Sequence, residues 1–253
     1  MNQDLERRAD DGKDQPGAKE AIGHGSGNLP DRSKQRGVPT AAERIVRLAY
    51  WLAVAAVAVQ TASHVANVAI WDGDVFALDA DAEENAFAWA GSAMTFAAAL
   101  MVFLPAVSAR TVDRAGLVLA AAIAFFSLDD AVSLHERVGA KSVEALGVSV
   151  SLDRLMWPVV YMPLFALVFL LLWRVAHRGP AVIRRPILTG LGLLIAAVVL
   201  EVSSALYLSA EQEKTWPDTI EVVLEEGAEL GGWILIAGAL AARVYVRAQE
   251  ELR

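Results

Sequence analysis

The chain has 253 residues, of which 55% are hydrophobic, with a mean hydropathy of +0.40, no cysteine and a formal net charge of −8. An apolar content this high, gathered in several long blocks, excludes an ordinary soluble domain. The lack of cysteine excludes disulfides, iron–sulfur clusters and thiolate chemistry, and the acidic balance argues against a nucleic-acid partner. The composition therefore predicts a multi-pass membrane protein.

The N-terminal segment differs from the rest of the chain. Residues 1–40 are rich in glycine, proline and charge and hold almost no large apolar residue, so they cannot bury enough surface to fold. We predict a disordered cytoplasmic tail at residues 1–43 and one membrane domain at residues 44–250.

Six apolar blocks follow the tail, each long enough to cross about 30 Å of hydrocarbon, which takes about 20 helical residues. They cover residues 45–70, 85–107, 115–136, 155–176, 187–208 and 220–244. Backbone groups in lipid must be paired within their own segment, which favours helices. We therefore predict an all-α fold, a polytopic membrane helix bundle with six transmembrane helices.

The basic residues predict the orientation of these spans. One side of the predicted bundle collects fourteen lysines and arginines, and the other side has four, namely Arg137, Lys141, Arg154 and Lys214. Since basic residues favour the cytoplasmic side, both termini are predicted to be cytoplasmic. The acidic loop 71–84 would then be a solvated outer loop. The use of alanine and arginine over lysine suggests a bacterial plasma membrane.

Acidic side chains fall inside the predicted spans. The apolar run 115–128 has 14 residues and rises only about 21 Å, so the third helix is expected to continue to residue 136. The sixth helix must likewise extend back from residue 230, and the fifth carries an acid near its end. Each charged acid costs about 2.5–3.5 kcal/mol near the centre of a membrane helix. The affected acids and one imidazole are Asp129, Asp130, His135, Glu136, Glu201, Glu225, Glu226 and Glu229.

Helical spacing predicts which polar residues share a face. Three stripes result, and all three lie in the predicted outer halves of the spans: Gln60, His64, Asn67 and Trp71; Asn85, Trp89 and Ser92; and Asp129, Ser133 and Glu136. His135 stands about 120° off the last stripe, so either it faces a different neighbour or the helix end unwinds. The stripes together predict a chamber that opens to the outside. Trp157 and Tyr161 are interpreted as interfacial aromatic residues.

Carboxylates with two histidines, supplied by facing helices, are typical of a site for zinc, iron or manganese. The predicted metal ligands are Asp129, Asp130, His135, Glu136, Glu225, Glu226, Glu229, His64 and Glu201. His64 and Glu201 serve either as ligands or as partners that orient the ligands. Asp130 and Glu226 are the candidate catalytic bases toward a metal-bound water.

This pattern favours a metal-dependent membrane enzyme, a hydrolase or an oxidoreductase, that acts on a lipid-like or periplasmic substrate reached from the outer leaflet. One alternative is a proton- or cation-coupled transporter, although the inner halves of the spans are almost purely apolar. Another is a non-catalytic membrane component. Membrane lipids are the expected partners, and the sequence leaves the metal, the reaction and the oligomeric state open.

Overall fold

The structure is a computed structural model that describes residues 40–80, 82, 85–109, 111–147, 153–207 and 215–252; for residues 136, 153, 154 and 207 it describes the backbone alone. The predicted tail therefore lies almost wholly outside the described residues. Helix α1 begins at Ala41, inside the range predicted as tail, because Thr40 and Glu43 form a reciprocal capping box. Such a box satisfies backbone donors that a helix start leaves unpaired.

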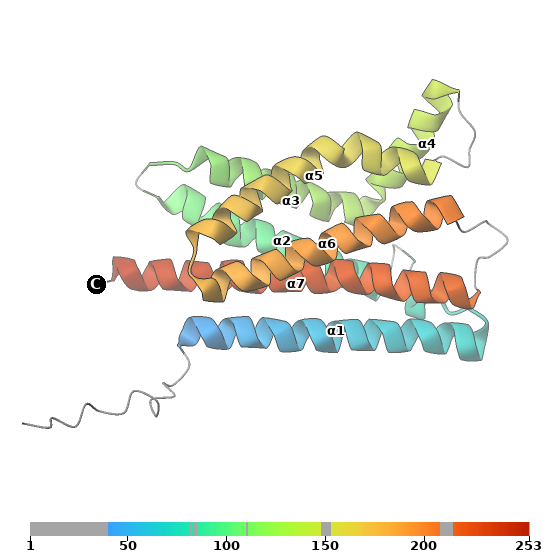
Figure 1. Ribbon diagram of the computed structural model, residues 1–253, viewed down its shortest axis with the longest axis horizontal. Helices are drawn as coiled ribbons and strands as arrows, with labels where there is room; N and C mark the ends of the chain where they lie inside the picture. Colours follow the sequence, from blue (N-terminus) through green and yellow to red (C-terminus); the bar gives the residue numbers. More distant parts are fainter. Residues whose placement is uncertain are drawn as a thin grey trace, which may run out of the picture. The chain divides into compact units, whose positions relative to one another are not determined.

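The described residues form seven helices and one short 3₁₀ turn (Figure 1). In chain order these are α1 (Ala41–Trp71), η1 (Phe76–Leu78), α2 (Ala86–Ser108), α3 (Arg114–Val132), α4 (Leu134–Leu146), α5 (Asp153–Arg178), α6 (Ala181–Tyr207) and α7 (Trp216–Glu251). All but α4 and the 3₁₀ turn are long and apolar enough to cross a membrane, which gives six candidate spans. The predicted all-helical fold is confirmed, the six candidate spans support a multi-pass membrane protein, and the orientation of the termini stays a prediction.

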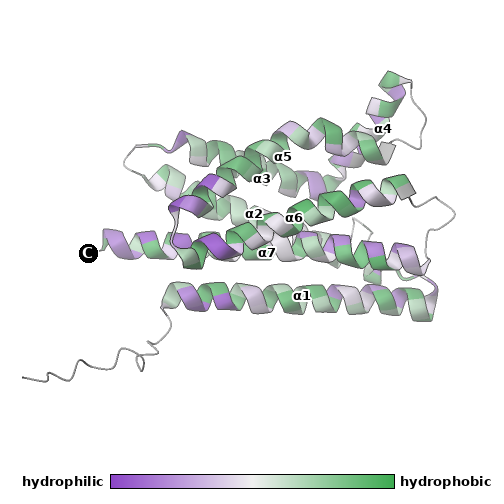
Figure 2. Cartoon of the chain, in the orientation of Figure 1, coloured by the Kyte–Doolittle hydropathy of each residue, from purple (hydrophilic) through white to green (hydrophobic). Residues whose placement is uncertain are grey.

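Helix α7 is the central element of the bundle. It packs against α6, α1 and α2, whereas α2 also packs on α3, and α5 packs on α6, α4 and α3. Figure 1 shows α1 and α7 side by side and antiparallel. In α7, 61% of the most apolar stretch is buried inside the bundle, against 22% in α1, α5 and α6. Figure 2 shows that α5 and α6 are hydrophobic along most of their length, as expected of helices that face lipid.

Small residues bring the backbones around α7 close together. A side chain added at Gly190 of α6 would place its Cβ 2.7 Å from the carbonyl oxygen of Gly232 in α7, and one added at Gly232 would lie 3.0 Å from the carbonyl oxygen of Gly190. Gly238 of α7 faces Ala49 of α1 in the same way. Because lipid provides no hydrophobic drive between helices, such close approach supplies packing energy instead.

The third span ends four residues earlier than predicted. Helix α3 stops at Val132, and Ser133 takes the left-handed conformation, with φ 51° and ψ 45°, before α4 begins at Leu134. The expectation of one continuous helix to residue 136 is therefore wrong, and so is the predicted stripe of Asp129, Ser133 and Glu136. The other alternative, an unwound helix end, is the one that the structure adopts. The span reaches 19 residues because α3 starts at Arg114 and includes both aspartates.

Candidate functional site

A cavity of about 1160 Å³ lies among the helices, with walls from α1 to α7 and from the segment between α1 and α2. We call it the chamber. Eight of the nine predicted site residues line it: His64, Asp129, Asp130, His135, Glu201, Glu225, Glu226 and Glu229. The ninth, Glu136, has a side chain outside the described part of the structure. Polar groups that are far apart in the sequence thus meet in one space.

The break at Ser133 creates the best-defined contact of the chamber. The left-handed turn at Ser133 after α3 brings His135 onto Asp129, so that His135 Nδ1 lies 3.2 Å from Asp129 Oδ2. On the other side of the carboxylate, the hydroxyl of Tyr161 in α5 donates a hydrogen bond of 2.8 Å to Asp129 Oδ1. Asp129 is only 6% exposed. The carboxylate is therefore held from both sides, and it orients the imidazole.

Two aromatic residues of α5 belong to this site, contrary to the interpretation of both as interfacial. Tyr161 is buried and bonded to Asp129. The ring of Trp157 lies 4.9 Å from the His135 ring, between centroids, and its indole N–H donates a 3.3 Å hydrogen bond to Glu201 of α6. Trp157 thus connects the imidazole of α4 with the acid of α6. Sequence reasoning could not assign these two residues to the site, since both stand where interfacial aromatic residues also occur.

The opposite wall of the chamber is acidic. The carboxyl group of Glu225 in α7 lies close to those of Glu201 in α6 and Glu221 in α7. One turn further along α7, Glu229 and Trp233 also line the chamber. Several carboxyl groups packed this closely within a membrane span are stable only when protons or cations offset their charge.

The α1 side of the chamber is closed by the chain that follows this helix. As predicted, Gln60, His64 and Asn67 form a buried stripe, although Trp71 at its end is 45% exposed. The Asn67 side chain accepts the backbone N–H of Val75 at 2.9 Å, and His64 Nδ1 accepts that of Ala80 at 3.0 Å. We call the segment 72–80 the strap. It lies against α1 and contributes Gly73, Asp79 and Ala80 to the chamber wall.

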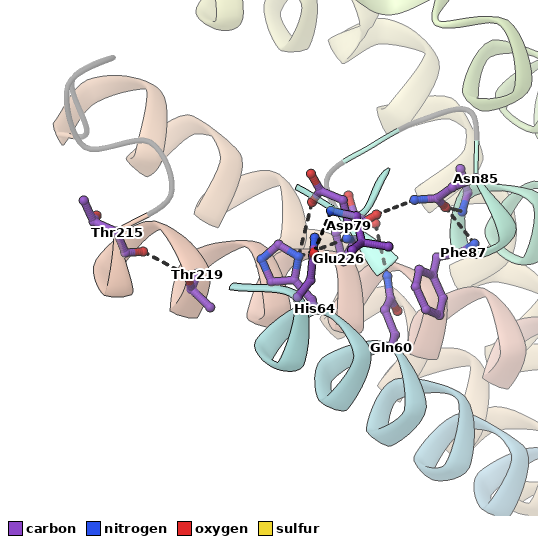
Figure 3. A network of polar contacts seen from close by, with 12 residues as sticks. Gln60, His64, Asp79, Asn85, Phe87, Thr215, Thr219 and Glu226 are labelled. Atoms are coloured by element: carbon purple, nitrogen blue, oxygen red, sulfur yellow. Dashed lines mark hydrogen bonds and ion pairs between the residues drawn. The ribbon is translucent and has the colours of Figure 1, made fainter. Parts of the chain in front are cut away.

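The prediction of a solvated acidic loop holds for the start of the strap, where Asp72 and Asp74 are exposed, but not for its end. Asp79 Oδ1 lies 3.2 Å from His64 Nδ1, and Ala80 is buried. Figure 3 shows the His64 ring beside Asp79, with Gln60 one turn earlier on α1 and Glu226 of α7 next to them. Gln60 donates to Glu226 over 3.5 Å. Asp79 is thus a site residue that sequence reasoning missed, because an acid in a loop carries no helical period.

The predicted polar stripe on α2 does not face the chamber. Trp89 is 73% exposed, and Asn85 caps the helix by accepting the N–H groups of Phe87 and Ala88. Ser92 exchanges two hydrogen bonds with Ser127 of α3, 2.7 and 2.8 Å long. Ser92 thus holds α2 and α3 together, whereas Asn85 caps α2 and donates a hydrogen bond to the backbone carbonyl of Asp79 in the strap.

The arrangement of the acids bears on the predicted metal centre. Within the described ranges, no group of three or more His, Asp or Glu side chains is placed so as to hold a metal ion. The histidines instead form two separate pairs with aspartates, His64 with Asp79 and His135 with Asp129. Nothing in the described residues therefore adds support to the predicted set of nine ligands.

Comparison with known proteins gives one match. A family model described as a domain of unknown function (DUF8692) matches residues 46–243, which covers the bundle from α1 to α7. No curated protein and no solved structure matches the chain.

Proposed function

The chain belongs to the DUF8692 family, whose function is unknown, and we propose a function from the chamber alone. The protein is a multi-pass membrane enzyme that binds an amphipathic substrate. His135, oriented by Asp129, is its acid–base group. The single observation that carries the proposal is the contact of 3.2 Å between His135 Nδ1 and Asp129 Oδ2 in the chamber wall. The enzyme would sit in a bacterial plasma membrane, with the chamber in the outer half.

The walls of the chamber support an amphipathic substrate. Apolar side chains of α3, α5, α6 and α7, among them Phe126, Phe165, Leu194 and Trp233, line the same cavity as the acids and imidazoles. Pockets for small molecules have volumes of about 300–1,000 Å³, so a cavity of about 1160 Å³ accepts a head group together with an acyl chain. A lipid-like molecule would place its tail against the apolar wall and its reacting bond near His135.

The His135–Asp129 pair supports proton transfer. When Nδ1–H of a neutral imidazole donates to a carboxylate, the proton-accepting nitrogen is Nε2, and the carboxylate stabilises the imidazolium that forms. His135 would take a proton from water as the water attacks an acyl or phosphoryl centre, and would return that proton to the leaving group. Tyr161 would keep Asp129 in place through its 2.8 Å hydrogen bond. The reaction class is hydrolysis.

Asp130 and Glu226, the candidate bases from the sequence, line the same chamber and would bind the substrate in this scheme. Dependence on zinc, iron or manganese stays a prediction, for which elemental analysis of the purified protein is the direct test. A proton- or cation-coupled transporter is the alternative that the acidic wall also supports, and flux that requires Glu201 in proteoliposomes would favour it.

The experiment is an unbiased search for turnover. Purified protein in nanodiscs is incubated with a total bacterial lipid extract, and lipids that disappear or form are recorded by mass spectrometry. We expect His135→Ala to lower the rate by about 100-fold or more, because general-base catalysis contributes about 10²–10⁴-fold. The matched control is His177→Ala, since His177 lies exposed at the far end of α5. Equal rates for wild type and His135→Ala, or no lipid turned over by the folded protein, would refute the proposal.

A further inference from the structure

The charge of the chamber walls is one-sided. The described residues that line the chamber include nine Asp and Glu side chains and two histidines, but neither lysine nor arginine. This is a local feature, because the chain as a whole has 22 lysines and arginines against 30 acids. Opposite charges stabilise buried carboxylates, and the two imidazoles are the only side chains among the described lining residues that can become cationic. A ligand with a positive charge would supply the missing counter-charge.

A second and independent observation comes from the α1 side. His64 is 5% exposed and Asn67 is fully buried, and both line the chamber. His64 Nδ1 makes both of the contacts of this ring, to the N–H of Ala80 and to Asp79, and the other ring nitrogen, Nε2, has no hydrogen-bond partner. Asn67 Oδ1 accepts the N–H of Val75, and its Nδ2, which can only donate, also lacks a partner. Buried polar groups in native proteins are nearly always paired, so the Asn67 amide calls for an acceptor and His64 Nε2 for a hydrogen-bonding partner beside it.

A third observation, the apolar part of the chamber, concerns the tail of the ligand. Phe165 and Phe169 of α5 and Leu194, Ile195 and Val198 of α6 line the cavity. These residues belong to two helices that are candidate membrane spans. An acyl chain held here would lie in surroundings as apolar as the lipid that it leaves.

We infer that the chamber binds an amphiphile whose head group joins a cationic nitrogen to a hydrogen-bond-accepting oxygen. The cation lies against the acids of α7, the oxygen against His64 and Asn67, and the acyl chain against α5 and α6. The inference rests on the proposed function in that it names the class of substrate. It would identify the head group by its chemistry, a substituted ammonium beside an alcohol, ester or phosphate oxygen.

The test is a binding titration that needs no turnover, with the full chain in nanodiscs and protein-free nanodiscs to subtract partitioning. Three amphiphiles with the same chain length are titrated below their micellar concentrations: dodecylphosphocholine, dodecyltrimethylammonium and dodecanoate. We expect saturable binding of the two probes that carry a quaternary ammonium group, strongest for the zwitterionic dodecylphosphocholine, and none for dodecanoate. Binding of dodecanoate as tight as that of dodecyltrimethylammonium would overturn the inference.

Two substitutions remove charge without changing shape. Glu225→Gln and Glu229→Gln should each weaken dodecyltrimethylammonium binding by about 30-fold or more, the loss expected when one partner of a buried ion pair is removed. Glu250→Gln is the matched control, because Glu250 is exposed near the end of the same helix. If all three variants bind the cation like the wild type, the acids do not form its site and the inference fails.

One substitution separates the oxygen contact from the cation contact. Asn67→Asp keeps an acceptor for the N–H of Val75 and removes the donor, so it should abolish the preference for dodecylphosphocholine without weakening dodecyltrimethylammonium. An unchanged preference would remove the assigned role of Asn67. The outcome is distinguishable from failure of the proposed function: turnover that depends on His135, without selectivity for a cation, would leave the enzyme standing and refute only this ligand class.

Discussion

The hydrogen bond from Tyr161 to Asp129 offers a sharp test of the site geometry. Tyr161→Phe deletes the hydroxyl that lies 2.8 Å from Asp129 Oδ1 and keeps the ring in its aromatic cluster with Phe125, Phe126, Trp157 and Phe165. Hydrogen bonds to charged groups contribute about 1.5–3 kcal/mol, and loss of a partner leaves a buried acceptor undersatisfied. Asp129 keeps His135, so we expect the free energy of unfolding to fall by about 2 kcal/mol.

The assay is reversible unfolding in mixed micelles, followed by circular dichroism as the fraction of sodium dodecyl sulfate rises. Tyr50→Phe is the control, because Tyr50 lies 38% exposed on α1 and its change should stay within about 0.5 kcal/mol. In an Asp129→Asn background, Tyr161→Phe should cost clearly less than in the wild type, since neighbouring groups couple by about 0.5–3 kcal/mol. A Tyr161→Phe protein as stable as Tyr50→Phe would refute the hydrogen-bonded arrangement.

Three further predictions concern the backbone around the chamber. Ser133→Gly should stabilise the protein by about 0.5–1 kcal/mol, whereas Ser133→Val should destabilise it by about 1–2 kcal/mol, because φ 51° favours glycine; thermal unfolding measures both. Gly190→Ala should cost about 1–3 kcal/mol, since the new methyl would lie 2.7 Å from the Gly232 carbonyl, and micellar unfolding measures this loss. Asn67→Ala removes the acceptor of the Val75 N–H, so hydrogen exchange in the strap should speed up while exchange in α6 stays unchanged.

Each of these predictions has an internal control. For Gly190 it is Gly192→Ala on the same helix, which has open space around it and should leave stability unchanged or slightly higher. For Ser133, equal effects of glycine and valine would contradict the left-handed turn. For the strap, exchange at residues 72–80 as slow in Asn67→Ala as in the wild type would show that Asn67 does not hold it.

The spans were predictable because their determinants are local. A helix in lipid pairs its backbone within itself, so length and hydropathy suffice to find each of the six candidates. The apolar run 230–242, which is too short to span a bilayer, also predicted correctly that the last helix extends back through Glu225, Glu226 and Glu229; it begins at Trp216. The polar stripe of Gln60, His64 and Asn67 followed from spacing in the same way.

The details of the site were not predictable from spacing. His135 stood out of phase with Asp129, which left open whether the imidazole faces a different neighbour or the helix end unwinds, and did not predict that a left-handed Ser133 would turn it onto the same aspartate. The roles of Tyr161 and Trp157 depend on how α5 is rotated toward α3 and α6. Asp79 reaches His64 only because the strap folds back.

The amino-acid sequence by itself determined the number of candidate spans, their helical nature and the set of acids and imidazoles that cannot face lipid. Each of these follows from the free-energy cost of placing a given residue in lipid. Only the tertiary structure decided the partners: Asp129 with His135 and Tyr161, His64 with Asp79, and Glu201 with Trp157. The physical reason is that a side chain's cost of burial is its own property, whereas the group that offsets this cost depends on the rotation and crossing of whole helices.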